Sequence, residues 1–239
     1  MRILSFNTID SFARNHLEAA TMVEWVEDAL AHKQEAILPA KTVVDLDERL
    51  LGCPGTGFYD VMPAIVPHLG IAGTKLVDGF PQRSPSVAAE ITVTDLATGE
   101  LLALVDGTWI TAWRTGAVAA HSALTFANTH PTTNAHAVTN ARPTDGSSSN
   151  GSPTDGSSAD SNYADMQRIG IVGLGNTAVT FLHIMASAHP ERFYEVTVLQ
   201  YKDQHERFAE RFTGFPNVVY RYAPASGGEG YCVERRQPF

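Results

Sequence analysis

The sequence predicts an α/β protein, in which an N-terminal α+β domain is followed by part of a parallel βαβ domain. Three observations support this prediction: short β-rich runs in the first half, a low-complexity segment after them, and a strand, glycine turn, helix and strand beyond it. The 239 residues, of which 44% are hydrophobic, can bury one large core or two moderate ones. We expect two domains, covering residues 1–128 and 167–239, joined by a linker or insertion at residues 129–166.

The first domain is expected to combine a helix with a sheet. Thr21 and Glu24 have the spacing of a capping box, and apolar residues then recur on one helical face as far as about Lys33. Four β-rich runs bounded by Gly, Pro and Asp follow, at Phe58 to Val66, Gly70 to Phe80, Ala89 to Leu96 and Glu100 to Gly107. The last two alternate apolar and polar residues around a Gly-containing loop, which predicts a hairpin with one buried face.

A helix rich in small residues should end the first domain. It runs from Thr108, its expected cap, to about Asn128, and its many Ala residues allow another backbone to approach closely. The composition then changes, because Pro131 to Ser161 is rich in Ser, Thr, Asn, Pro and Gly and contains PTDGSS twice. Such a segment cannot bury enough apolar surface to offset its ordering entropy, so we interpret it as a flexible linker or surface insertion.

Beyond this segment, strand and helix patterns alternate. An apolar strand, Arg168 to Gly175, ends in glycines and precedes a helix, Asn176 to Ala188, and a second strand, Tyr194 to Tyr201. A further helix at Asp203 to Phe212 and a third strand at Asn217 to Ala223 continue the pattern. This order is typical of a parallel βαβ unit.

The turn after the first of these strands matches the pattern G-x-G-x-x-A of Rossmann domains. Its matching residues are Gly173, Gly175, Asn176, Thr177 and Ala178. In such a turn the glycines let a pyrophosphate approach the backbone, and the amides and dipole of the helix start bind the phosphates. The triplet alone is a weak motif, but its strand and helix context favours an NAD or NADP site over a purely structural turn.

The residue that would hold the ribose of the cofactor is Gln200, at the end of the second strand. An acid is usual there, and it binds the 2'-hydroxyl of NAD. The Gln200 amide can also bond a hydroxyl, and Lys202 can meet a 2'-phosphate, so both cofactors stay open. The alternative is that both residues are simply exposed at the strand end.

Charge and composition exclude several function classes. A net charge of -9 without a Lys/Arg cluster disfavours nucleic acid as a partner. No run approaches the roughly 18 apolar residues of a membrane span, and charged residues interrupt the first 16, unlike a secretory signal. We therefore expect a cytoplasmic protein with no membrane partner.

The sequence also lacks the usual motifs of metal and serine chemistry. Cys53 and Cys232 are interpreted as reduced thiols, and the 9 histidines show no H-E-x-x-H spacing, so no metal site is expected. There is no G-x-S-x-G nucleophile turn. His121 and His183 are better explained as packing or surface residues than as general bases.

Five segments of the chain then occur in a recognisable order. They are VMPA at Val61 to Ala64, GTKLVDGFP at Gly73 to Pro81, a D-x-x-T-G hairpin and a T-A-x-R-T helix within Ser86 to Ala120, and GIVGLGNTA at Gly170 to Ala178. In this order they resemble the ornithine cyclodeaminase and mu-crystallin family. The resemblance covers most of residues 15 to 127 and 167 to 222.

By that resemblance, Lys75 and Arg114 match the positions that hold the α-carboxylate of the substrate, and Thr115 lies where the helix faces the cofactor. Two cations satisfy a small carboxylate better than one, and Arg adds a planar bidentate fork. Lys41 matches a substrate-binding position where the family commonly has arginine, and Gln82 stands where asparagine is frequent, so the clamp is looser here. Without the family context, such charges are usually solvated surface residues.

The resemblance implies an NAD(P)-dependent enzyme acting on a small α-amino acid, first of all conversion of ornithine to proline with release of ammonia through an imine. Other branches oxidise alanine-like substrates, reduce cyclic ketimines, or bind the cofactor with little turnover. It also implies a homodimer formed through the sheet of the first domain, although a helix of the same chain could cover that sheet instead.

The catalytic aspartate of the family lies beyond the third and fourth strands of its dinucleotide domain. After Tyr222 the sequence shows no strand or helix pattern that supplies it, so the catalytic residue is unassigned. We expect a C-terminally truncated member, which is active, binds cofactor without turnover, or has lost its function.

Overall fold

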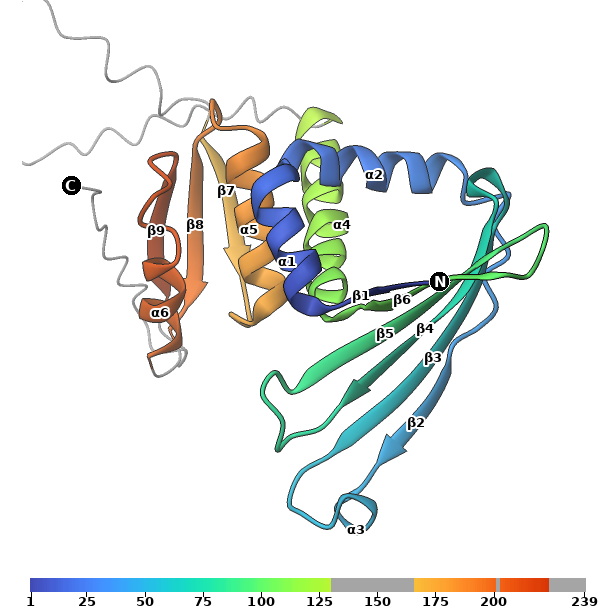
Figure 1. Cartoon of the computed structure of the whole chain (residues 1–239). Helices are drawn as coiled ribbons and strands as arrows, with labels where there is room; N and C mark the ends of the chain where they lie inside the picture. Colours follow the sequence, from blue (N-terminus) through green and yellow to red (C-terminus); the bar gives the residue numbers. More distant parts are fainter. Residues whose placement is uncertain (130–165, 201–202, 224–239) are drawn as a thin grey trace, which may run out of the picture. The chain divides into compact units, whose positions relative to one another are not determined.

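The computed structural model describes residues 1–129, 166–200 and 203–223 (Figure 1). These residues form a mixed α/β fold, which confirms the predicted fold class. They fall into two compact units, one made of Met1–Ser122 with Gly175–Ala188 and the other drawn from Ala123–Leu174 and His189–Phe239. The low-complexity segment, the tail after Ala223 and Cys232 lie outside the described residues.

The first unit is built on a six-stranded mixed sheet (Figure 1). In spatial order its strands are β1 (Arg2–Leu4), β6 (Leu101–Asp106), β5 (Val87–Asp95), β4 (Ile71–Gly79), β3 (Gly57–Val66) and β2 (Thr42–Leu46). β1 is parallel to β6, and all other neighbours are antiparallel. The four β-rich runs of the sequence correspond to β3, β4, β5 and β6, whereas β1 and β2 were not predicted.

The pleat of this sheet separates a covered face from an open face. Val77, Ala89 and Val105 are buried and occupy the covered face. Because side chains alternate along a strand, Lys75 points to the same face as Val77, and Thr74 points to the open face. The register therefore places a lysine on the apolar side of the sheet.

The first unit also contains helices. They are α1 (Phe6–His16), α2 (Ala19–Ala31), α3 (Glu48–Leu51), the 3-10 helix η1 (Pro67–Leu69), α4 (Thr108–Thr129, whose last residues belong to the second unit) and α5 (Asn176–Ala188). α2 begins after Glu18, which makes no side-chain cap bond, so the predicted capping box at Thr21 and Glu24 is wrong. α1 was also not predicted.

The start of α4 is fixed to the sheet. The Asp106 carboxylate accepts a hydrogen bond of 2.9 Å from the backbone N–H of Thr108. The Thr108 hydroxyl accepts one of 3.2 Å from the backbone N–H of Ala89 in β5. Thr108 therefore ties the helix to the sheet, and the capping role that we predicted for it is taken by Asp106.

The second unit contains a three-stranded parallel sheet in the order β7 (Gln167–Ile171), β8 (Tyr194–Leu199) and β9 (Val218–Ala223). α6 (Gln204–Glu210) lies between β8 and β9 in the chain. Val196, Val198 and Phe208 are buried. The predicted alternation of strands and helices is confirmed here, although the first strand ends at Ile171 rather than at Gly175.

Candidate functional site

A cluster of charged side chains occupies the covered face of the first sheet. Lys75 in β4 lies opposite Met62 of β3 and Ile91 of β5. Burial and then the positive charge of Arg114 lower the pKa of Lys75 to about 8, while the Asp60 carboxylate raises it. The structure therefore brings Lys75 close enough to Arg114 for their charges to interact, although the two are far apart in sequence.

Asp60 is the residue of this cluster that the sequence analysis missed. It is buried in β3, and its Oδ2 accepts a hydrogen bond of 2.9 Å from Lys41 Nζ, just before β2. Its Oδ1 is also buried and has no hydrogen-bond partner among the described residues. The signal that could have revealed it is an acid within the apolar run FYDVMPAIV.

The cluster thus holds three cations and one carboxylate. Lys75 is half-buried, whereas Lys41 and Arg114 are exposed. Asp60 can offset only one of the three positive charges, so the cluster retains an excess that favours an anion. A carboxylate offered to Lys75 and Arg114 would gain charge-assisted hydrogen bonds in a partly desolvated setting, where such bonds are strongest.

The helix that carries Arg114 lies side by side with α5 (Figure 1). At Gly116, a Cβ atom would come within 2.7 Å of the backbone nitrogen of Phe181, so the absence of a side chain permits this close approach. Across the contact, the Thr180 hydroxyl lies 3.1 Å from the carbonyl of Ala112, one of three carbonyls to which it can donate. The predicted close approach to this small-residue helix is thus observed, and it places the first turns of α5 beside the part of α4 that includes Arg114.

Thr115 follows Arg114 on α4 and is half-buried. Its hydroxyl donates to the carbonyl of Thr111 at 2.7 Å. A helical Thr commonly makes this bond to its own helix, and the hydroxyl oxygen retains the capacity to accept a further hydrogen bond.

The glycine turn connects β7 to α5 and is open around its two glycines. Gly173 has a φ of 83°, a conformation that L side chains rarely adopt. A Cβ at Gly173 or at Gly175 would meet no protein atom within 4 Å, so both positions are open. α5 begins at Asn176, so the N–H groups of Asn176, Thr177 and Ala178 have no acceptor within the helix. The residues present therefore fit the pyrophosphate of a dinucleotide.

Gln200 follows β8, and its backbone N–H donates to the carbonyl of Ala223 at 2.7 Å. Its side chain is half-buried at the carboxyl end of a parallel strand, where cofactors of open α/β sheets bind. Lys202, the residue that we considered for a 2'-phosphate, lies outside the described residues.

The two histidines considered in the sequence analysis lie on α4 and α5. His183 on α5 is half-buried, its ring meets the Trp113 ring edge-on at 5.1 Å, and burial lowers its pKa. His121 Nε2 lies 3.6 Å from a carboxylate oxygen of Glu27.

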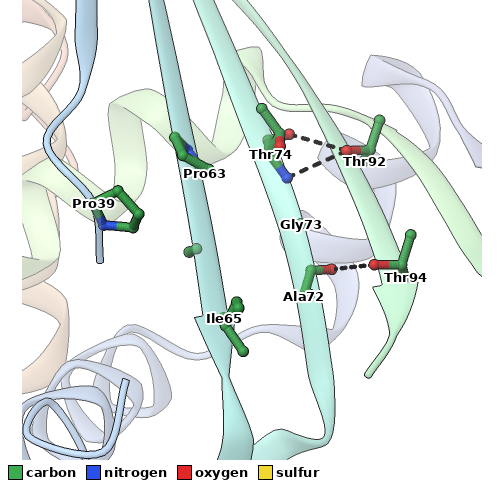
Figure 2. A pocket seen from close by; sticks show the side chains of 9 residues that line it. Pro39, Pro63, Ile65, Ala72, Gly73, Thr74, Thr92 and Thr94 are labelled. Carbon is green, nitrogen blue, oxygen red and sulfur yellow. Dashed lines mark hydrogen bonds between the residues drawn. The ribbon is translucent and has the colours of Figure 1, made fainter. Parts of the chain in front are cut away.

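The open face of the first sheet carries a shallow hollow (Figure 2). It is lined by Pro39, by Pro63, Ala64 and Ile65 of β3, by Ala72, Gly73 and Thr74 of β4, and by Thr92 and Thr94 of β5. The Thr92 and Thr94 hydroxyls donate to the backbone carbonyls of Thr74 and Ala72 in β4, so their methyl groups contribute to the lining. The hollow is therefore mainly apolar and lies on the opposite face from Lys75.

Comparison with known families identifies the chain. The model of the ornithine cyclodeaminase/mu-crystallin family matches residues 10–135, more than half of the sequence. The chain belongs to this family. The resemblance inferred from the five ordered segments is thereby confirmed. The family comprises NAD(P)-dependent enzymes, among them cyclodeaminases, reductases and dehydrogenases.

Solved structures share the fold of this family member. An archaeal alanine dehydrogenase dimer with bound NAD is 20% identical, with a TM-score of 0.62 over 94% of this chain and 56% of that one. A Thermococcus litoralis Δ1-pyrroline-2-carboxylate reductase in complex with NADH and L-proline is 22% identical, with a TM-score of 0.60 over 93% and 57%. A lysine cyclodeaminase is 22% identical, with a TM-score of 0.61 over 96% and 62%. This chain thus spans less than two thirds of the length of these relatives.

No curated protein sequence matches the chain. None of the described helices combines the length and the apolar character needed to cross a membrane.

Proposed function

We propose that this protein binds NAD or NADP and a small α-amino or α-imino acid, and that it takes part in hydride exchange at the α-carbon of that acid. The first candidate reaction is the conversion of ornithine to proline with release of ammonia. Reduction of a cyclic ketimine and oxidation of an amino acid are related alternatives. The structural neighbours support this range, because they include a cyclodeaminase, a reductase and a dehydrogenase.

The observation that carries the proposal is the electrostatic coupling of Lys75 and Arg114. Arg114 lowers the pKa of the half-buried Lys75, and the Asp60 carboxylate offsets this lowering only in part. Two cations held together in this way repel each other and gain most when an anion binds between them. A substrate carboxylate is such an anion.

The glycine turn supports the cofactor half of the proposal. Gly173, Gly175 and the N–H groups at the start of α5 would hold the pyrophosphate, and Gln200 would bond a ribose hydroxyl. Within the first unit, Thr180 brings the early turns of α5 to α4 two residues before Arg114, which supports a phosphate site at the start of α5 close to the clamp. When bound, the nicotinamide supplies the hydride chemistry, and the protein supplies orientation and charge.

Each residue of the cation cluster has a distinct proposed task. Arg114 offers a planar fork that can bind both oxygens of a carboxylate, and Lys75 offers a point charge from the sheet. Lys41 would add a weaker contact, because Asp60 already accepts its hydrogen bond. The clamp would thus fix the acid and leave its α-carbon to be oriented by the rest of the site.

The test combines cofactor binding with turnover. NADH and NADPH are titrated by fluorescence into the full chain, and ornithine-dependent release of ammonia is then measured. Gly175→Val should weaken cofactor binding by more than about 10-fold, equal to about 1.4 kcal/mol. The fold should tolerate this change, because the new side chain meets no protein atom at its Cβ. Arg114→Gln should keep cofactor binding and abolish the ammonia signal. Equal cofactor affinity in wild type and Gly175→Val would refute the assigned pyrophosphate site.

A second candidate is binding without turnover, as in the mu-crystallin branch. The observation that favours it is the family match, because the family is named after mu-crystallin as well as ornithine cyclodeaminase. It predicts saturable cofactor binding with no ammonia release from ornithine. A chain that binds neither cofactor would contradict both candidates.

We also propose that the protein forms a homodimer through the open face of its first sheet. This face carries exposed apolar side chains, including Ile3 at 69%, Val44 at 47% and Leu104 at 38% exposure, beside the apolar hollow. A contiguous apolar face of this kind favours a protein partner. The archaeal alanine dehydrogenase is itself a dimer.

Light scattering coupled to size exclusion tests the dimer. Wild type should elute as a dimer and Leu104→Arg as a monomer, because the charge would be buried in the interface. Leu50→Arg is the matched control, since Leu50 is 62% exposed on α3, which is not a strand of the sheet, and should leave the dimer intact. A monomeric wild type would contradict the proposal.

A further inference from the structure

A second cluster of potential ligands lies at the end of α2. Asp28 and His32 are four residues apart, with His32 as the C-cap of the helix, and His68 comes from η1 between β3 and β4. A ligand atom from each of the three residues lies within 4.8 Å of the others. Among the described residues this is the one group of three or more His, Cys, Asp and Glu side chains with such spacing.

Two distances within the cluster are close to those between the ligand atoms of a metal site. His32 Nδ1 lies 3.3 Å from Asp28 Oδ1, and His68 Nε2 lies 3.5 Å from Asp28 Oδ2. In a tetrahedral zinc site, with bonds of about 2.0–2.1 Å, neighbouring ligand atoms are about 3.3 Å apart. Both carboxylate–imidazole distances are close to this value, although they involve different oxygens of Asp28.

The His68 ring makes no hydrogen bond to the described residues. Its side chain is 15% exposed, and both of its ring nitrogens are buried without a hydrogen bond among the described residues. A buried polar group without a partner is costly, so such a group commonly serves a ligand. Asp28 is 55% exposed, which leaves an entry path from solvent.

We propose that Asp28, His32 and His68 bind a divalent transition metal ion, with Zn²⁺, Ni²⁺ and Co²⁺ as the chemical class. Two imidazoles and one carboxylate are donors that suit these ions, and two ligands four residues apart on a helix share one face. The cluster was outside the sequence prediction, because Asp28-x-x-x-His32 becomes a three-ligand set only when the fold adds His68.

Binding requires one local rearrangement. The His32 and His68 rings are stacked, with centroids 4.2 Å apart and planes 13° from parallel, so their lone pairs do not meet at one point. The His32 side chain is 35% exposed and can turn about its own torsions, exchanging its contact with the Asp28 carbonyl for the ion. The ion would then link the end of α2 to the β3–β4 connection and stabilise the first unit.

The test uses untagged full-length protein, freed of metal with a chelator and titrated with Co²⁺. We expect visible d–d absorption that saturates at one equivalent, and a higher unfolding temperature with Zn²⁺. His32→Gln and His68→Gln should each weaken binding by at least about 10-fold, since even outer partners of a metal site cost that much. His189→Gln is the matched control, because His189 Nδ1 pairs with Glu191 Oε1 at 3.1 Å without a third ligand.

Asp28→Asn provides a variant that should fold, because Asp28 is exposed and the change is nearly isosteric. It should also weaken Co²⁺ binding, and circular dichroism without metal checks the fold of each variant. The proposal is overturned if wild type binds no Co²⁺, or if the Asp28→Asn and His68→Gln proteins bind it as tightly as wild type does.

Discussion

Raising the pH from about 7 to about 9 should weaken carboxylate binding by this protein about 10-fold. The reason is Lys75, whose pKa is lowered from 10.5 to about 8, first by burial and then by Arg114. Because a lysine is charged when it is protonated, Lys75 carries its positive charge below about pH 8 and loses it above that pH. The charged fraction falls from about 0.9 at pH 7 to about 0.1 at pH 9, and a clamp that needs the charge weakens in proportion.

The titration of Lys75 can be measured directly, without assuming a substrate. Competitive acetylation with isotopic reagents, read by mass spectrometry across pH, reports the pKa of Lys75 in the free protein. Arg114→Gln should raise that pKa, because a like charge is removed, while burial still keeps it below 10.5. Asp60→Asn should lower it, because an opposite charge is removed.

Carboxylate binding is then followed at the same pH values. Lys75→Arg should bind almost equally at pH 7 and pH 9, since a guanidinium stays charged in this range. The reasoning is refuted if Lys75 titrates near 10.5, or if Arg114→Gln leaves its titration unchanged. Either result would mean that the two cations do not share a site.

Three further predictions concern other parts of the molecule. Gly116→Ala should destabilise the protein by about 1–3 kcal/mol in urea unfolding, because its Cβ would lie 2.7 Å from a backbone nitrogen of α5; an unchanged midpoint would contradict the close contact. Arg221→Gln should cost about 1–3 kcal/mol, since it leaves the buried Glu195 carboxylate without its 2.7 Å partner. Arg168→Gln removes the ion pair of Arg168 with Glu195, which is 3.7 Å long and involves a side chain 77% exposed, so it should lower the stability by less than about 1 kcal/mol. Equal losses of stability in the Arg221 and Arg168 variants would contradict this prediction. Gln200→Glu should raise the preference for NADH over NADPH in fluorescence titrations, because a carboxylate binds a 2'-hydroxyl and repels a 2'-phosphate; an unchanged ratio would remove Gln200 from the cofactor site.

Elements with strong local patterns could be predicted from the sequence. Runs of β-rich residues located β3 to β6, and the glycine-ended strand and the helix after it located β7 and α5. β1 was missed because it has three residues and depends on parallel pairing with the distant β6. β2 was missed because it is a short edge strand whose Val43 and Val44 remain exposed.

Some residues of the candidate site could likewise be predicted from local patterns, and others could not. The ordered motifs nominated Lys75 and Arg114 through the family resemblance, and the glycine turn nominated Gly173 and Gly175. No local pattern indicated that Asp60 would accept a hydrogen bond from Lys41, because that contact depends on the pairing of β2 with β3.

The sequence by itself determined the family, the main elements of both sheets and the residue types available for binding, because these depend on periodicity, turns and short motifs. Only the tertiary structure decided which charges interact, since sheet register and the α4–α5 contact bring together residues that are far apart in the chain. The lowered pKa of Lys75 and the meeting of His68 with α2 are both products of that packing. Burial and the distances between charges depend on the tertiary structure, so a sequence pattern alone does not give them.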